Sequence, residues 1–452
     1  MKKFLENNFK YLFYFFLFVL PWQTRLFLYQ GQIKGAYSEF ISVSLYVSDI
    51  ILVTLIMAAA IIFFADSKKF IKPNLKISKL WWFLAGLDAV FLISAFLSSD
   101  YRSAFYRYAL FLFGAALFFI ISQARHFRLK KITAIYVFLS SLFLHACLGI
   151  YQFLMQSTFA CKYLGLAQHL PYALSGESVL ENVSGRWLRA YGGFDHPNIF
   201  GAMMAVGVIL TVYLLINKTS NKKWLNLNLS FLFIFTLALF FSFSRGSWLA
   251  LAAAFVTWIL VEYQKPIFSY KLEFFRRPLF WGALLLLVIF LFQYSNLVTT
   301  RIGGKDRLEI KSVAERINYV IDAKNLLHDR WLFGVGPGNY VAAVTEINPH
   351  QPFWYYQPVH NYFLLAWAEL GIFGLLFFLC FFGTLIFSLS ISRRGHGLNL
   401  ALAAILIMVM MLEHWLFSLH FGILITWLLL GLISWAPDQA AQTRQVRNDL
   451  KK

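Results

Sequence analysis

Long apolar runs, separated by short polar segments, recur along the whole chain. A helix needs about 20 mostly apolar residues to cross a bilayer. By that rule the pattern predicts twelve membrane-spanning helices, at roughly 9–27, 46–65, 80–98, 103–122, 132–154, 197–216, 225–243, 247–263, 279–296, 360–390, 398–415 and 420–436. The tenth run is too long for one straight helix, and we expect it to bend or break at Gly371 and Gly374.

Two of the polar connections are longer than a simple connector needs to be, at residues 156–195 and 297–359. Loops of this length usually carry function or structure of their own. Inside the second, apolar residues recur at helical spacing and predict an amphipathic helix: Val313, Ile317, Val320, Ile321 and Leu327. This helix could lie on the membrane surface or cap the bundle.

Composition agrees with a membrane protein. The 452 residues are 60% hydrophobic and 13% charged, whereas soluble domains contain about 25% charged residues. We therefore predict an all-α, polytopic integral membrane protein, with residues 1–452 forming one transmembrane domain. The three cysteines, Cys147, Cys161 and Cys380, show no CxxC spacing, so neither a metal site nor a disulfide framework is predicted.

The charge pattern predicts orientation. The net charge is +19, but the basic residues are scattered through short loops, which indicates membrane topology rather than nucleic-acid binding. Every second loop is basic, and cytoplasmic loops carry an excess of Lys and Arg. Both termini are therefore predicted to be cytoplasmic, and the two long loops and their neighbouring helix ends to face outward.

Three polar clusters fall at the predicted outer membrane edge: Asp195-His-Pro-Asn198, Arg245 and His360. An imidazole can accept a proton near neutral pH, so His360 could act as a general base. It could equally cap a helix. Pro197 suits the first turn of a helix, whose free N–H groups favour an anion. A plain helix start would explain Pro197 as well.

Several arginines lie near these clusters, and the guanidinium fork suits phosphate oxygens. Arg186 and Arg189 precede the sixth predicted span, and a plain helix start does not account for them. Arg245 could bind an anion or merely supply the polar tip of a helical hairpin. Arg316 borders the apolar face of the amphipathic helix, where a solvated or headgroup-bound side chain is the simpler interpretation.

Four carboxylates lie within or at the ends of predicted spans: Asp49, Asp88, Glu369 and Glu413. Intramembrane carboxylates can form proton or ion pathways. These four are not clustered in the sequence, which argues against a relay. Arg107, near the start of the fourth span, could pair with one of them.

Two motifs resemble the O-antigen ligase/polymerase superfamily. Ligases of this family show an Arg-x-x-x-Leu element, here Arg245-Gly-Ser-Trp-Leu249. They also show His-[Asn/Ser/Gln]-x9-Gly-x-x-[Gly/Thr/Tyr], here His360-Asn361 followed by Gly371-Ile-Phe-Gly374. His-Pro-Asn at 196–198 and the glycine-rich segment 334–340 are also similar. The resemblance is firmest over about residues 186–380.

The resemblance implies a GT-C-like, inverting membrane glycosyltransferase of the bacterial inner membrane, with its active site on the periplasmic face. The donor would be a glycan on undecaprenyl pyrophosphate, and the acceptor a sugar of the lipid A core. Neither metal nor cofactor is implied. His360 would be the catalytic base. The arginines Arg186, Arg189, Arg245 and Arg316 would bind pyrophosphate, with His196, Asn198, Asn361, Gly371 and Gly374 in support.

Other functions remain open at this point. The same family contains O-antigen and surface-polysaccharide polymerases and protein O-glycosyltransferases, which share the donor and differ in the acceptor. A transporter of the lipid-linked glycan belongs to a different class. Transporters commonly show repeated halves and charges at the membrane midplane, whereas this chain shows no evident repeat and carries its polar clusters at one edge. A receptor-like or structural role is the remaining alternative.

Overall fold

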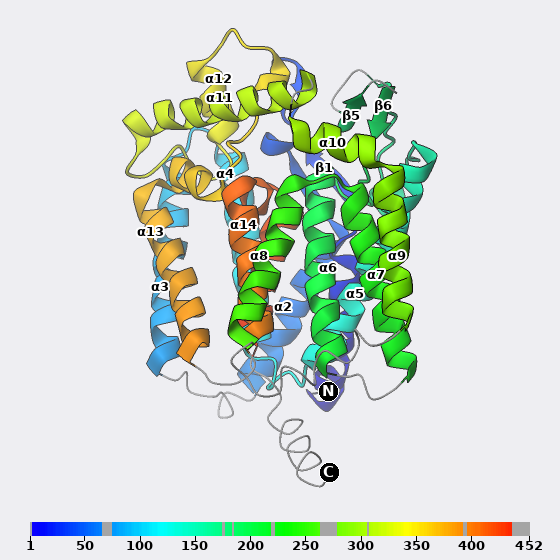
Figure 1. Ribbon diagram of the computed structural model, residues 1–452. Coiled ribbons are helices and arrows are strands. Elements are labelled where there is room, and N and C mark those ends of the chain that lie inside the picture. The colour runs from blue at the N-terminus through cyan, green and yellow to red at the C-terminus, as the bar shows by residue number, and fades with distance from the viewer. Residues whose placement is uncertain are drawn as a thin grey trace.

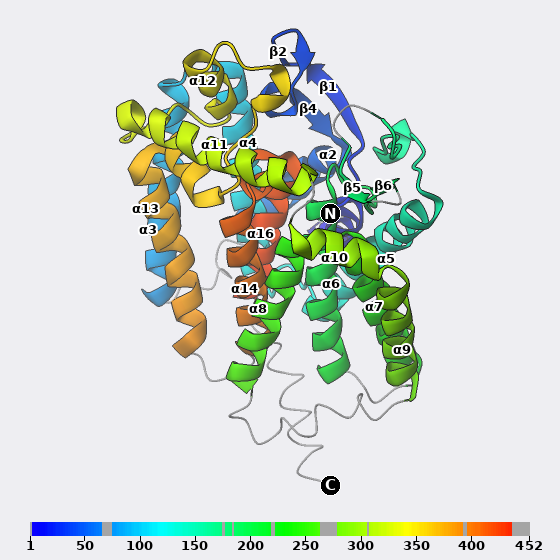
Figure 2. The ribbon, with the colours of Figure 1, turned by 45° about the horizontal axis from the view of Figure 1, so that its top comes forward.

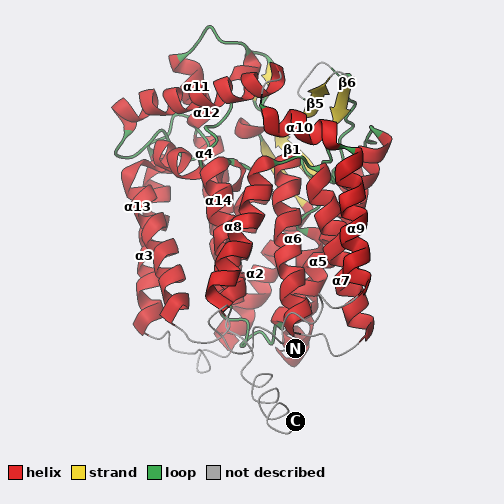
Figure 3. Ribbon diagram, viewed as in Figure 1, coloured by secondary structure: helices red, strands yellow, loops and turns green. Residues whose placement is uncertain are grey.

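The computed structural model is mostly helical (Figure 3). It describes residues 2–65, 75–173, 177–182, 185–217, 222–262, 278–304, 307–391 and 396–435. Each predicted span contains an apolar helix: α1 (Lys2–Val19), α2 (Val47–Ala65), α3 (Leu75–Phe96), α4 (Tyr101–Ser122), α5 (Lys131–Met155), α6 (Pro197–Asn217), α7 (Lys222–Phe241), α8 (Arg245–Glu262), α9 (Pro278–Gln293), α13 (Tyr362–Ile391), α14 (His396–Leu412) and α16 (His420–Ser434).

The length and hydropathy of these helices support the predicted fold class. Within the described ranges, seven helices are long and apolar enough to cross a membrane, and an eighth span results if the bent pair beginning in α9 is counted as one. Shorter apolar helices lie within α1, α8, α14 and α16. The prediction of an all-α, polytopic membrane protein is confirmed.

The prediction for residues 9–27 is wrong at its C-terminal end, because α1 stops at Val19. Pro21 follows, and proline cannot continue the hydrogen-bonding pattern of a helix. The apolar residues beyond it form strand β1 (Arg25–Tyr29), which pairs antiparallel with β4 (Val43–Tyr46). Between them, β2 (Gln32–Ile33) and β3 (Ala36–Tyr37) are joined by a two-residue turn.

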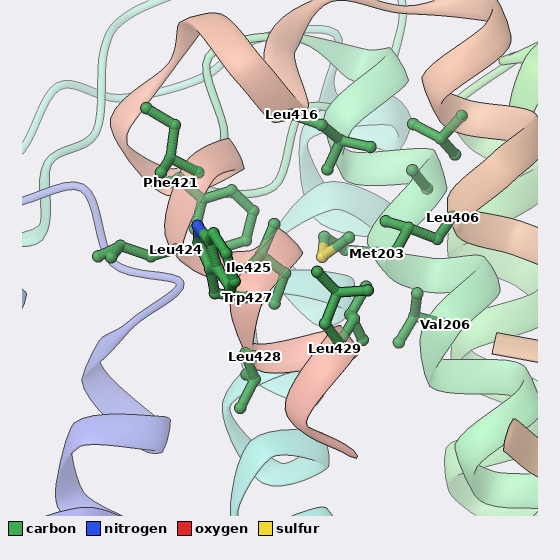
Figure 4. Close-up of a cluster of buried hydrophobic side chains, with 14 of the residues drawn as sticks. Met203, Val206, Leu406, Leu416, Phe421, Leu424, Ile425, Trp427, Leu428 and Leu429 are labelled. Carbon is green, nitrogen blue, oxygen red and sulfur yellow. The ribbon is translucent and has the colours of Figure 1, made fainter. Parts of the chain in front are cut away.

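The helix α6 occupies the centre of the bundle. Of its membrane-length window, 89% is buried inside the protein, and it packs against α5, α7, α8 and α14. Figure 4 shows Met203 and Val206 of α6 facing apolar side chains of α14 and α16, among them Leu406 and Leu429. Dense apolar packing on all sides holds the ends of α6, α8 and α14 in fixed relative positions.

A cap of short elements covers one end of the bundle (Figures 1 and 2). It contains β5 (Val179–Asn182), β6 (Gly185–Leu188), α10 (Ser295–Gly303), α11 (Arg307–Arg330), α12 (Tyr340–Ile347) and the short helical turns η1 (Glu39–Ile41), η3 (Lys162–Leu164) and η5 (Phe353–Tyr355). The N-terminus lies at the opposite end (Figure 1).

The helix α11 confirms the predicted amphipathic helix, but only part of the predicted apolar stripe, including Leu327, is buried against the protein. Its buried apolar residues are Tyr319, Ala323, Leu326 and Leu327. Val313, Ile317 and Ile321 are instead exposed. Helical spacing showed that an apolar stripe exists, but it could not show which side meets the protein.

The long helix α13 breaks at Gly371, as predicted. Gly371 has φ 71° and ψ −177°, a conformation that favours glycine. The turn after α11 docks against the break: Ile372 N–H donates to the Trp331 carbonyl at 2.9 Å, and Val335 N–H donates to the Ala368 carbonyl at 2.9 Å. Gly374 lies in the helical part that follows.

Candidate active site

The three predicted polar clusters lie at the capped end of the bundle. Helices α6, α8 and α13 all begin there (Figure 1). Residues 195–198 span the start of α6, Arg245 is the first residue of α8, and His360 lies two residues before α13. Side chains from these segments form two groups of polar contacts, each built around one carboxylate.

Glu413 is the centre of the first network. It lies between α14 and the short helix α15 (Trp415–Ser418), and its side chain is 11% exposed. One carboxylate oxygen is 3.2 Å from His360 Nδ1. The other accepts a hydrogen bond from Asn198 Nδ2 at 2.7 Å and lies 3.5 Å from the Arg316 guanidinium.

These contacts keep Glu413 charged. Burial alone would raise the pKa of the Glu413 carboxyl, but the interaction with His360, together with the charge of Arg316, outweighs burial and lowers the pKa to about 2. The carboxylate is therefore ionised at neutral pH, and it can stabilise positive charge on the neighbouring imidazole.

His360 is held between two rings and remains accessible. The Tyr319 ring stacks on the imidazole with centroids 5.9 Å apart, and the His414 ring approaches edge-on at 4.8 Å. The His360 side chain is 24% exposed. In the tautomer with the proton on Nδ1, that nitrogen donates to Glu413, which leaves Nε2 as a base. Asn361 caps α13 by accepting from Leu364 N–H at 2.9 Å.

A second carboxylate joins two arginines beside this network. Arg245 donates to Glu309 Oε2 at 2.7 Å, and Arg301 contacts Glu309 Oε1. Arg245 also donates to the Arg301 carbonyl at 3.1 Å. The Glu309 side chain is only 6% exposed, whereas that of Arg245 is 38% exposed and open to an incoming anion.

Arg189 lies deeper than expected of a residue that binds a ligand directly. It is 4% exposed, and it donates to the Ser242 carbonyl and to Asn198 Oδ1, each at 2.7 Å. Burial lowers the pKa of its guanidinium to about 9. Arg189 therefore joins the loop before α8 to the start of α6, and Asn198, which accepts from Arg189, also donates to Glu413.

His196 and Arg186 also occupy fixed positions. His196 Nε2 is 2.7 Å from Ser178 Oγ, and its Nδ1 accepts from Asn198 N–H at 3.0 Å. Burial lowers the pKa of His196 to about 3, so its ring is neutral at pH 7. Arg186 lies apart from the network and pairs with Glu181 at 3.4 Å.

Several residues of the site were not predicted to act there: Arg301, Glu309, Tyr319 and His414, with Glu413 considered only as an isolated carboxylate. The adjacent acid and histidine at 413–414, directly after an apolar run, were the available signal. The other intramembrane carboxylates have separate partners. Asp49 pairs with His420 at 2.6 Å, Asp88 accepts from Tyr108 at 3.0 Å, and Glu369 accepts from Gly338 N–H at 2.6 Å.

Arg107 forms no close ion pair with a carboxylate among the described residues: its guanidinium donates to the Phe40 carbonyl at 3.0 Å, and its charge acts on Glu369 at longer range. Across the described part of the chain, no three His, Cys, Asp or Glu side chains gather in a group that could hold a metal ion. The chemistry that the site itself offers is an imidazole oriented by a carboxylate, next to a group of arginines.

The fold and the site together define a polytopic membrane protein with a histidine–glutamate pair and a group of arginines at one end of its bundle. Comparison with known proteins narrows the class. The family model described as O-Antigen ligase matches residues 229–379, a range that includes Arg245, Glu309, Arg316 and His360. An O-antigen polymerase from Salmonella muenchen is 25% identical over 300 residues, covering 63% of this chain and 67% of the relative.

Both matches support the O-antigen ligase-like superfamily for this chain, and the resemblance predicted from the motifs is confirmed. The same matches support an O-antigen ligase/polymerase-type membrane enzyme, and they do not distinguish a ligase from a polymerase. The matched range ends before Glu413 and begins after Arg189. The hydrogen bonds of the fold, rather than the family match, bring these two residues to the site.

Proposed function

We propose that this enzyme is an inverting, metal-independent glycosyltransferase that transfers a glycan from undecaprenyl pyrophosphate to a sugar hydroxyl. The acceptor we propose is the lipid A core, as in O-antigen ligases. The observation that carries the proposal is the His360–Glu413 pair at 3.2 Å, in the same network as Arg316, whose charge acts on Arg301. A base and a cationic site are the two things this transfer requires.

The residues have distinct roles in this mechanism. The acceptor hydroxyl attacks the anomeric carbon while His360 takes its proton. The bond between that carbon and the diphosphate oxygen breaks, and its electron pair leaves with the diphosphate. Arg245, Arg301 and Arg316 stabilise the negative charge that develops there. Glu413 stabilises the imidazolium that forms, and attack from the side opposite the leaving group inverts the anomeric centre.

The charge pattern of the loops supports the proposed placement in a bacterial inner membrane. The N-terminus, predicted to be cytoplasmic, lies at the end of the bundle opposite the cap (Figure 1). With this orientation the site faces the periplasm, where a lipid-linked donor and a glycan acceptor can meet it.

A second candidate is an O-antigen polymerase, which the name of the Salmonella relative favours. The two activities use the same donor and differ in the acceptor. A polymerase consumes one donor as the acceptor for another and gives a ladder of products, whereas a ligase adds glycan to the lipid A core. Separation of products by size distinguishes the two, and transfer to a protein would indicate a protein O-glycosyltransferase.

The first experiment compares wild type with His360→Ala, using purified protein, undecaprenyl-pyrophosphate-linked glycan, an acceptor and no added metal. His328→Ala is the matched control, because the His328 side chain is 86% exposed and lies outside the network. We expect wild type and the control to transfer glycan and His360→Ala to fail while remaining folded. Undiminished transfer by His360→Ala would reduce His360 to a helix cap. Donor flipping without transfer would indicate a transporter.

A further inference from the structure

Glu309 holds the two arginines that a donor diphosphate would need. It lies in the first turn of α11 and contacts Arg245 with one carboxylate oxygen and Arg301 with the other. The Arg301 guanidinium is fixed further by donating to the Phe243 carbonyl at 2.9 Å. In this structure the Glu309 carboxylate therefore balances the positive charge of both arginines.

The contact between Glu309 and the two arginines affects how an anion can reach them. Arg316 and Arg245 are the more accessible arginines, with side chains 42% and 38% exposed, whereas Arg301 is 13% exposed. The Glu413 carboxylate lies beside Arg316, and the Glu309 carboxylate contacts both Arg245 and Arg301. A diphosphate that approaches Arg245 must come close to Glu309, and like charges repel strongly where little water separates them.

We propose that Glu309 competes with the donor diphosphate for Arg245 and Arg301. The two arginines bind the Glu309 carboxylate until the donor arrives and takes its place. This inference rests on the proposed function, because it assumes that the arginines bind a diphosphate. Glu309 is a residue that sets affinity through the arginines, and it takes no part in the chemistry.

Competition of this kind matters most after transfer. Cleavage of the glycosidic bond leaves one further negative charge on the diphosphate, so uncompeted arginines would hold the product more tightly than the donor. A carboxylate that returns to Arg245 and Arg301 helps to displace that product. The helix N-terminus at Glu309 favours a negative charge at this position whether or not the arginines are occupied by a ligand.

The test is the affinity of the purified, full-length protein in detergent for undecaprenyl pyrophosphate. Glu309→Gln keeps the size of the side chain and removes its charge. We expect it to bind undecaprenyl pyrophosphate about tenfold more tightly than wild type, which corresponds to about 1.4 kcal/mol. Its kcat should fall where product release limits turnover. Glu315→Gln is the matched control on the same helix, because the Glu315 side chain is 36% exposed and its only ion pair within the described residues is a long one with Lys311 at 3.6 Å.

The opposite results separate this inference from the proposed function. If Glu309→Gln binds the lipid diphosphate no more tightly than wild type, while Arg245→Ala binds it more weakly, Glu309 only orients the arginines and the competition is overturned. If Arg245→Ala leaves binding unchanged, the arginine site itself is wrong, and this inference falls with it. Glu309→Asp, which keeps the charge, should bind like wild type. Thermal melting of each variant identifies those that fail to fold.

Discussion

Replacing Glu413 by Gln tests whether the carboxylate acts through His360. The substitution keeps the shape of the side chain and its ability to accept from Asn198 Nδ2, now 2.7 Å away. It removes the negative charge that lies 3.2 Å from His360 Nδ1. The proposed mechanism places a positive charge on the imidazole only as the acceptor loses its proton. The lost interaction should therefore slow the chemical step.

The size of the effect follows from the contact. A hydrogen bond to a charged group contributes about 1.5–3 kcal/mol, and the Glu413 side chain is only 11% exposed, so water replaces little of it. A loss of about 2 kcal/mol corresponds to a decrease of about 30-fold in kcat. Arg316 keeps an acceptor oxygen at 3.5 Å in the same variant but loses the negative charge of that partner. It becomes more available to the donor, so the donor KM should stay the same or fall.

Steady-state transfer by purified wild type, Glu413→Gln and Glu413→Asp measures both quantities. Glu413→Asp keeps the charge and should recover part of the lost kcat, which a general packing defect would not allow. A kcat for Glu413→Gln within about twofold of wild type would refute the reasoning. So would a raised donor KM at unchanged kcat, since that would make Glu413 part of the donor site instead.

Two further outcomes are expected. Gly371→Ala should unfold at a much lower temperature than wild type, because the new Cβ would lie 2.0 Å from the Leu332 carbonyl oxygen. Gly383→Ala in the same helix is the control and should be neutral or slightly stabilising, because no atom lies within 4 Å of its new Cβ. Equal melting temperatures of the two variants in detergent would mean that the turn after α11 is not docked against Gly371. Burial lowers the pKa of His196 to about 3, whereas an unfolded histidine has a pKa of about 6.5. The contribution of His196 to stability is therefore complete above about pH 6.5. It is lost as the pH falls toward 3, by at most about 1.4 kcal/mol per pH unit. Unfolding measured at pH 7 and at pH 5 should therefore show a smaller loss for His196→Asn than for wild type, while His328→Asn should match wild type.

The helices could be predicted from the sequence because a bilayer requires every spanning backbone group to be bonded within its own segment. Outside the bilayer this constraint disappears. The apolar residues after Pro21 therefore resembled the end of a span, although they form strand β1. Local spacing also located the break at Gly371, because glycine readily adopts the positive φ found there.

The arrangement of the site was only partly predictable. Motifs identified His360 and Arg245, because each lies in a recognisable local pattern. Glu413 carries no such pattern, and its role depends on how α13 and α14 pack. The depth of Arg189 is a property of the same packing: the pair of arginines at 186 and 189 looks alike in the sequence, yet one is buried and the other pairs with Glu181 near the surface.

In the proposed mechanism, the position of Glu413 also sets when the enzyme becomes active during its own synthesis. Its partners Asn198, Arg316 and His360 precede it in the chain by 215, 97 and 53 residues. A nascent chain inserted in order therefore contains the histidine and the arginines before it contains the carboxylate that contacts them. We expect full activity only once α14 and the segment after it are in place, so that activity toward the proposed lipid-linked donor would indicate completed assembly.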